Sequence, residues 1–121
     1  MKNCIFCKII VGEIKTDFIY QDEQVVAFKD LHPIAPIHIL IISKKHISFI
    51  SDIVEKDKDL MGQMILVAKK IADDFDLSTN GYKLLFRVKK YGGQEIDHIH
   101  LHLIGGAPLY EDIHALPEKK L

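Results

Sequence analysis

Three histidines alternate with apolar residues near the C-terminal end of the chain, at His98, His100 and His102. Alternate residues of a β-strand point to the same face of a sheet, so this pattern predicts a row of imidazoles on one face and an apolar stripe on the other. Histidine is the side chain whose ordinary pKa lies nearest neutrality. The row can therefore supply a base, an acid, a nucleophile or metal ligands.

The length of this row limits what its members can do together. In an extended strand the Cα atoms of His98 and His102 lie about 13 Å apart, whereas zinc holds each ligand nitrogen at about 2.0–2.1 Å. We therefore expect the row to divide its work, with one end binding a metal or bracing the fold and the other end contacting a substrate.

Cys4 and Cys7 have the Cys-x2-Cys spacing of half a zinc site. His46 and His98 are the candidates for the other two ligands, and a closed set of two cysteines and two histidines would make the metal structural. The alternative is that both cysteines are small apolar residues on an N-terminal helix. A redox dithiol fits less well, because no strand precedes the pair.

His38 and Asp30 each have a structural and a functional interpretation. His38 interrupts an apolar strand, so it is either a hydrogen-bonded core histidine or a group that supports the histidine row. Asp30 is either an ordinary turn residue or a carboxylate that accepts hydrogen bonds from sugar hydroxyls. The diglycine Gly92-Gly93 before Gln94 allows the backbone to approach a phosphate closely.

The composition sets the class of protein. With 121 residues, 48% of them hydrophobic, and a net charge of −1, the chain reads as one domain over residues 1–121 without an electrostatic reason to bind nucleic acid. No apolar run reaches the roughly 18 residues of a membrane span, and the N-terminus lacks a signal-peptide core. We expect a cytoplasmic protein without a structural disulfide.

The hydrophobic pattern predicts strands and one long helix. We expect a short helix over residues 4–12, strands over 18–20, 25–28, 37–42, 82–88 and 96–104, a helix over 57–76, and a polar loop over 89–94. Short connections between such strands indicate an antiparallel α+β domain.

Residues 93–103, Gly-Gln-Glu-Ile-Asp-His-Ile-His-Leu-His-Leu, resemble the His-x-His-x-His signature of the histidine triad (HIT) family. The flanking diglycines, Gly92-Gly93 and Gly105-Gly106, look like those of its Hint-type branch, the nucleoside phosphoramidate hydrolases. Segments 5–10, 27–30, 35–38 and 44–48 stand where the family has its other landmarks, so the resemblance covers nearly the whole chain.

The resemblance implies a HIT-like fold, with a five-stranded antiparallel sheet, two helices and a homodimer in which the two sheets join. His100 would attack the α-phosphate of a purine nucleotide and form a nucleotidyl-histidine intermediate, without a catalytic metal. His102 would contact the phosphate and the leaving group. His98 would be structural, and His38 would complete the polar cluster.

The resemblance also implies the binding residues. Asp30 would bind the ribose, and Arg87, Gly93, Gln94 and Glu95 would surround the phosphate. The purine would lie against an apolar wall of Ile5, Phe6, Ile9, Phe28, Leu31 and Leu40. A structural zinc ion would be held by Cys4, Cys7, His46 and His98.

The sequence departs from the family pattern at Arg87, which replaces a neutral asparagine, at Glu95, which replaces a serine, and at Asp97, which replaces an aromatic residue. If Arg87 points into the site, its planar guanidinium can hold a phosphate through two hydrogen bonds. If it points into solvent, its substitution would change affinity little.

The predicted function is hydrolysis of purine nucleoside phosphoramidates or aminoacyl-adenylates, with release of a nucleoside monophosphate. Three alternatives remain at this stage. The protein could hydrolyse dinucleoside polyphosphates or transfer nucleotides. It could be a nucleotide-binding regulatory protein with weak activity. It could also be a zinc hydrolase with a catalytic metal.

Overall fold

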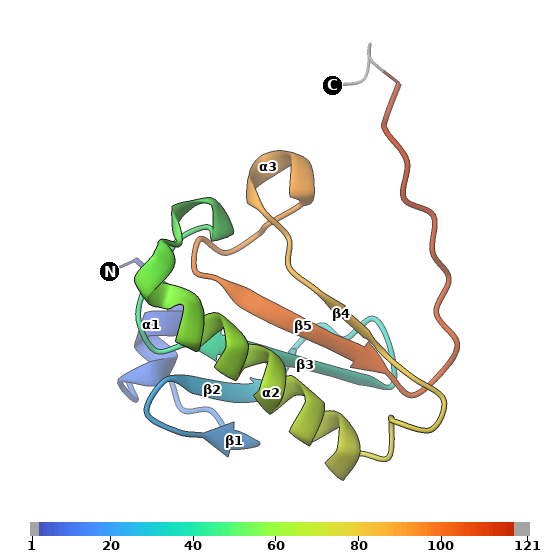
Figure 1. Cartoon of the computed structure of the whole chain (residues 1–121), viewed down its shortest axis with the longest axis horizontal. Coiled ribbons are helices and arrows are strands. Elements are labelled where there is room, and N and C mark those ends of the chain that lie inside the picture. The colour runs from blue at the N-terminus through green and yellow to red at the C-terminus, as the bar shows by residue number, and fades with distance from the viewer. Residues whose placement is uncertain (1–2, 118–121) are drawn as a thin grey trace.

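The computed structural model describes residues 3–117 and consists of one sheet with a helix on each face (Figure 1). The helices and strands follow in the order α1 (Ile5–Ile10), β1 (Tyr20–Gln21), β2 (Val25–Lys29), β3 (Ile37–Ser43), α2 (Lys58–Asp74), β4 (Lys83–Leu85), α3 (Lys89–Gly92) and β5 (His100–Gly105). Two 3-10 turns, Ile50–Asp52 and Glu55–Asp57, connect β3 to α2.

The five strands form one antiparallel sheet in the order β1-β2-β3-β5-β4. β3 and β5 are the central pair, and their register runs from Ile37 opposite Gly105 to Ile42 opposite His100. Every residue of β5 is buried, whereas β4 forms one edge of the sheet. The predicted antiparallel α+β fold is therefore confirmed.

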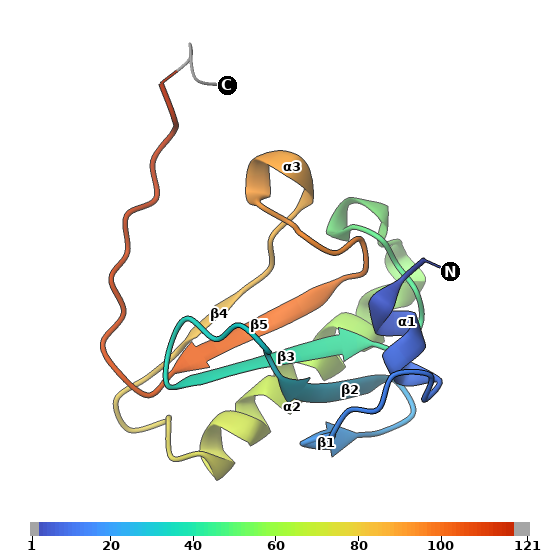
Figure 2. The same cartoon turned by 180° about the vertical axis from the view of Figure 1, so that it is seen from behind.

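Strand alternation divides the side chains between two layers. Ile39 and Ile41 of β3, with Leu101 and Leu103 of β5, join the apolar core beneath α2. The other face of the sheet packs against α1 in a second, smaller apolar cluster (Figure 2). That cluster contains Phe6, Ile9, Val26, Phe28, Leu40 and Ile42. His100 and His102 point to the α1 face, since they alternate with the leucines.

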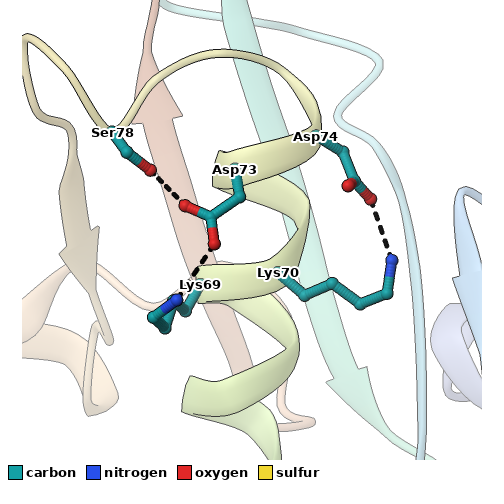
Figure 3. A network of polar contacts seen from close by, with 5 residues as sticks. All are labelled: Lys69, Lys70, Asp73, Asp74 and Ser78. Carbon is teal, nitrogen blue, oxygen red and sulfur yellow. Dashed lines mark hydrogen bonds and ion pairs between the residues drawn. The ribbon is translucent and has the colours of Figure 1, made fainter.

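The long helix α2 is amphipathic, and its buried side contains Leu60, Met64, Val67, Ala68, Ile71 and Ala72. On its solvent side, Lys69 pairs with Asp73 at 2.9 Å and Lys70 with Asp74 at 3.0 Å, each one turn apart (Figure 3). Ser78 donates a hydrogen bond to Asp73 as well. These contacts offset the unfavourable position of two carboxylates at a helix C-terminus. We interpret this end of α2 as a solvent-exposed surface without a binding role.

Two predicted boundaries near the histidine row are wrong. The strand expected from residue 96 begins at His100, because the N–H of Ile99 donates to the carbonyl of Ile47, beyond the end of β3, and the N–H of His98 donates to Ile96. The predicted loop over 89–94 contains the single turn α3, an addition to the two expected helices. α3 is followed by its C-cap Gly93, whose φ of 79° is the left-handed conformation that glycine adopts without strain.

After β5 the described chain continues as an extended segment up to residue 117, in which Glu111 pairs with Lys83 of β4 (Figure 1). In the described part of the protein, no helix combines the length and the apolar character that crossing a bilayer requires.

Candidate active site

A cavity of about 360 Å³ lies on the α1 face of the sheet, and it has an apolar wall and a polar side. The apolar wall is formed by the six residues predicted for it: Ile5, Phe6, Ile9, Phe28, Leu31 and Leu40. The polar side contains seven further predicted residues: Asp30, His38, Arg87, Gly93, Glu95, His100 and His102. The structure thus brings together residues from segments that lie far apart in the sequence.

Gln94 is the predicted binding residue that does not line this cavity. Its side-chain oxygen accepts a hydrogen bond from the N–H of Lys89 at 2.8 Å, and its amide nitrogen donates to the carbonyls of Ser48 and Ile96. Both polar groups of its side chain therefore hold the loop around α3 in place.

His100 has a fixed tautomer. Its Nδ1 lies 2.7 Å from the backbone carbonyl oxygen of His98. A carbonyl only accepts hydrogen bonds, so Nδ1 carries the hydrogen and donates. Burial lowers the pKa of His100 more than its neighbours raise it, which keeps the ring neutral. The neutral ring then has a free electron pair on Nε2, the form that a nucleophile requires.

His38 and His102 form a hydrogen-bonded pair with a defined direction. The N–H of Ile34 donates to Nδ1 of His38 at 3.2 Å, so the neutral ring carries its hydrogen on Nε2. This Nε2 lies 2.9 Å from Nδ1 of His102 and 3.4 Å from the Asp30 carboxylate. Because Nδ1 of His102 accepts, the hydrogen of that ring lies on its Nε2.

Nε2 of His102 is buried and has no hydrogen-bond partner within the described residues 3–117. A buried N–H without a partner costs free energy of the order of 1–3 kcal/mol, so such a group in a cavity wall suits a bound acceptor. Burial, then His100, His38 and Arg87, lower the pKa of His102 to about 4. Burial likewise lowers the pKa of His38 more than Asp30 raises it. The free site therefore holds both rings neutral at neutral pH.

Cys4, Cys7, His46 and His98 form a second cluster beside the cavity, with their ligand atoms all within 4.8 Å of one another. Sγ of Cys4 lies 3.3 Å from Nδ1 of His98, and Sγ of Cys7 lies 3.2 Å and 3.6 Å from Nδ1 of His46 and His98. A tetrahedral zinc ion with ordinary Zn–S and Zn–N bonds needs these separations to be about 3.5 Å. The four side chains therefore fit a tetrahedral metal ion.

The protonation of this cluster also suits a metal ion. Nε2 of His98 donates to the carbonyl of Ser43 at 2.6 Å, which leaves the Nδ1 electron pair directed at the cysteines. Burial lowers the pKa of His98 to about 4, so the ring is neutral as a ligand must be. Burial and then the neighbouring Cys4 raise the pKa of the Cys7 thiol to about 11, and a bound cation would reverse this effect.

Helix α1 belongs to both sites. Sγ of Cys4 accepts the N–H of Cys7 and caps the helix, and both cysteines belong to the cluster that could hold a metal ion. Phe6, on the same helix, lines the cavity and packs edge-on against the rings of His98 and His100, at 5.7 Å and 5.1 Å between ring centroids. The cluster and the cavity wall therefore share one structural element.

A second hollow of about 770 Å³ lies over the metal cluster and is lined by Cys4, His46 and Asp97 among others. It is larger than the first but more open to solvent, and it lacks the histidine pair. We assign the chemistry to the more enclosed cavity that contains His100 and His102.

The sequence and the fold both resemble those of known proteins. Residues 11–109 match the HIT domain family. The chain belongs to this family. This HIT protein is 47% identical over 108 residues to the purine nucleoside phosphoramidase of Escherichia coli (strain K12), with 89% of this chain and 91% of the relative covered. It is also 42% identical over 105 residues to Protein HitA of Neisseria gonorrhoeae, with 87% and 97% covered.

Solved structures agree in fold. A HIT family hydrolase from Legionella pneumophila superimposes with a TM-score of 0.87 at 47% identity, covering 89% of this chain and 96% of the other. A histidine triad protein from Clostridium difficile gives a TM-score of 0.89 at 38% identity, covering 93% and 98%.

Sequence reasoning missed three residues that line the cavity, His32, Ile34 and Ile96. His32 and Ile34 lie in the proline-rich segment between β2 and β3, and Ile96 lies in the bend before the histidines. Pro33 and Pro36 indicate a chain reversal beside Asp30. That reversal was the available signal for His32 and Ile34. The pattern around Ile96 indicated a strand and concealed the bend.

Proposed function

We propose that this HIT protein hydrolyses purine nucleoside phosphoramidates through a nucleotidyl intermediate on His100. One observation carries the proposal: His100 and His102 line the same cavity beside an apolar wall. His100 has a free electron pair on Nε2, and His102 has a free N–H on its Nε2. A nucleophile and a proton donor in that arrangement suit phosphoryl transfer. The similarity to the E. coli phosphoramidase supports this substrate class.

The nucleoside would bind on the apolar side. The purine would pack between α1 and the β2–β3 face, where Phe6 and Phe28 meet edge to face at 5.8 Å between ring centroids. Asp30 follows β2 directly and would accept the ribose hydroxyls. Its Oδ1 already accepts the N–H of His32 at 2.8 Å, which fixes the orientation of the carboxylate.

The reaction would proceed in two displacements. Nε2 of His100 forms a bond to phosphorus while the P–N bond breaks, and the leaving nitrogen keeps the electron pair of that bond. Water then attacks phosphorus, the bond to His100 breaks, and a nucleoside monophosphate departs. Throughout, Nδ1–H of His100 donates to the carbonyl of His98, which stabilises the positive charge that develops on the ring.

The His38–His102 pair would move the proton that this sequence needs. The anionic phosphate favours uptake of one proton by the pair, and Nε2 of His102 delivers it to the leaving nitrogen as the P–N bond breaks. In the second step the attacking water returns a proton to the pair. Protons therefore balance over one turnover, which consumes one water and releases one amine and one nucleoside monophosphate.

Three further assignments belong to this proposal. We propose that Cys4, Cys7, His46 and His98 hold a structural zinc ion, supported by the fit of their separations to a tetrahedral site. We propose a homodimer in which the sheets join, supported by the position of β4 at an edge of the sheet. We propose a cytoplasmic location, supported by two free thiols that an oxidising compartment would put at risk.

The test is turnover of adenosine 5′-phosphoramidate by the purified protein, followed as release of AMP and ammonia. We expect His100→Ala to lower turnover about a thousandfold or more while the fold is retained. His114→Ala is the matched control, because His114 is an exposed histidine of the tail, hydrogen-bonded to Asp112. A folded His100→Ala variant with turnover close to that of the wild type would contradict the proposal.

A further inference from the structure

Arg87 brings a positive charge to the cavity. This charge has no role in the two displacement steps proposed above. Leu85, at the end of β4, pairs with His102 in the antiparallel register. Continuing that register by two residues sets Arg87 opposite His100, and paired residues of antiparallel strands point to the same face. Arg87 accordingly lines the cavity, and a Cβ atom built on Gly93 would lie 4.0 Å from its Nη1.

The Arg87 side chain is exposed at the cavity mouth. Of the ion pairs formed between described residues, none involves Arg87. The charge nevertheless acts on His38: burial lowers the pKa of this ring, the Asp30 carboxylate raises it, and Arg87 lowers it further. An arginine without a carboxylate partner at the mouth of an anion site is available to a ligand.

The order of strands places Arg87 on the leaving-group side of the cavity. The apolar wall and Asp30 lie over β2 and β3, His100 lies on β5, and Arg87 lies beyond β5, just after β4. With the nucleoside over β2 and β3, phosphorus lies over His100 and the departing group extends toward Arg87. Neighbouring strands are about 4.8 Å apart, so the Cα atom of Arg87 stands about one strand spacing beyond that of His100.

We propose that Arg87 selects nucleoside phosphoramidates whose leaving amine carries a carboxylate. A guanidinium and a carboxylate match through two parallel hydrogen bonds, which favours this group over a neutral amide of the same shape. The inference rests on the proposed phosphoramidase function. It leaves the chemistry unchanged, because the carboxylate neither forms nor breaks a covalent bond while the P–N bond is cleaved.

Glu95 supplies an opposing charge on the same rim, because it also lines the cavity. Glu95 forms no ion pair with Arg87 among the described residues, so it repels a carboxylate without neutralising the guanidinium. Glu95→Gln is therefore expected to increase the preference for an anionic leaving amine, while changes at Arg87 decrease it.

The experiment compares kcat/KM for the adenosine 5′-phosphoramidates of β-alanine and of β-alaninamide, which share the P–N linkage and differ by one charge. We expect the wild type to prefer the carboxylate substrate about tenfold, the lower end for hydrogen bonds to charged groups, because the site is exposed. Arg87→Asn is expected to bring the ratio close to one, and Arg87→Lys to an intermediate value. Lys90→Asn is the control, because Lys90 is exposed on α3 and does not line the cavity.

The two ways of failing are distinct. If Arg87→Asn lowers kcat/KM equally for both substrates or for neither, the ratio is unchanged and the selection is overturned, while the phosphoramidase function stands. If the wild type hydrolyses neither substrate in a manner that requires His100, the proposed function and this inference fail together. A wild-type preference that falls with added salt and disappears in Arg87→Asn supports the inference.

Discussion

Removal of the proposed zinc ion is predicted to weaken nucleotide binding, because α1 belongs to both the candidate metal cluster and the cavity wall. Cys4 and Cys7 tie the start of this helix to His98, whereas Ile5, Phe6 and Ile9 face the cavity. A helix of six residues does not persist on its own in water, so its position depends on these attachments. Without the metal, we expect α1 to loosen while the sheet and α2 stay folded.

The size of the effect follows from the wall that α1 supplies. If the loosened helix leaves about 50 Å² of apolar surface on the base exposed, the loss at about 25 cal/mol per Å² is about 1.3 kcal/mol. That corresponds to a nearly tenfold increase in the Kd for AMP. Linkage requires the reverse effect to be equal, so saturating AMP should lower the apparent Kd for zinc by the same factor.

The assay is calorimetric titration of AMP into zinc-loaded and chelator-treated protein, with circular dichroism as the check that the sheet is retained. Zinc affinity, measured by competition with and without AMP, gives the reciprocal value independently of catalysis. Cys4→Ser with Cys7→Ser should reproduce the chelated state, and Lys8→Ala, on the same helix but outside both sites, should not. Equal AMP affinity in folded protein with and without metal would refute the coupling through α1.

Three further changes are predicted. His38→Ala removes the donor to His102, so turnover should fall about a hundredfold, with a larger loss for alkylamine than for aniline leaving groups in a series of substrates. Burial raises the pKa of Asp22, but hydrogen bonds outweigh burial and lower the pKa to about 2; the donors are Gln63, the Gln24 backbone, Tyr20 and the Val25 backbone. The ionised carboxylate therefore stabilises the folded protein above pH 4, and this stabilisation is lost as the pH falls from about 4 to 2. Asp22→Asn should lower the free energy of unfolding by less than about 1 kcal/mol, because the carboxylate is only partly buried. In thermal melts, the difference in Tm between this variant and the wild type should disappear as the pH falls to about 2. Met64→Ala, on the buried side of α2 at a site with 0% exposure, should lower the free energy of unfolding by about 2–5 kcal/mol in urea titrations without changing the Kd for AMP.

The strand pattern was sufficient to predict the layered fold. Alternation correctly assigned His100 and His102 to one face and Leu101 and Leu103 to the other, because both faces of β5 are buried and a slip of register would exchange them. The start of β5 at His100 was not predictable from the alternation of apolar and polar residues alone. The hydrogen bond from Ile99 to Ile47 that replaces the sheet ladder depends on where the segment after β3 lies, which is a tertiary contact.

The candidate site was predictable where residue types are rare and spacing is fixed. The Cys-x2-Cys pair and the histidine row indicated one metal cluster and one catalytic group, and the structure brings the four expected ligands together. The face of Arg87 was not predictable, because the sequence gives no register between the segments around residues 85 and 102. Gln94 was predicted beside the phosphate from the family resemblance, and the additional contacts of its amide with Lys89 and Ser48, which hold the α3 loop, had no signal in the sequence.

The central claim is that His100 forms a covalent bond to phosphorus, and the stereochemical course at phosphorus tests it most directly. A nucleoside phosphoramidate made chiral at phosphorus by sulfur substitution is hydrolysed in ¹⁸O-labelled water, and the configuration of the product is determined. Two in-line displacements, by His100 and then by water, predict net retention of configuration. Net inversion would show that water attacks the substrate directly, and it would contradict the role assigned to His100.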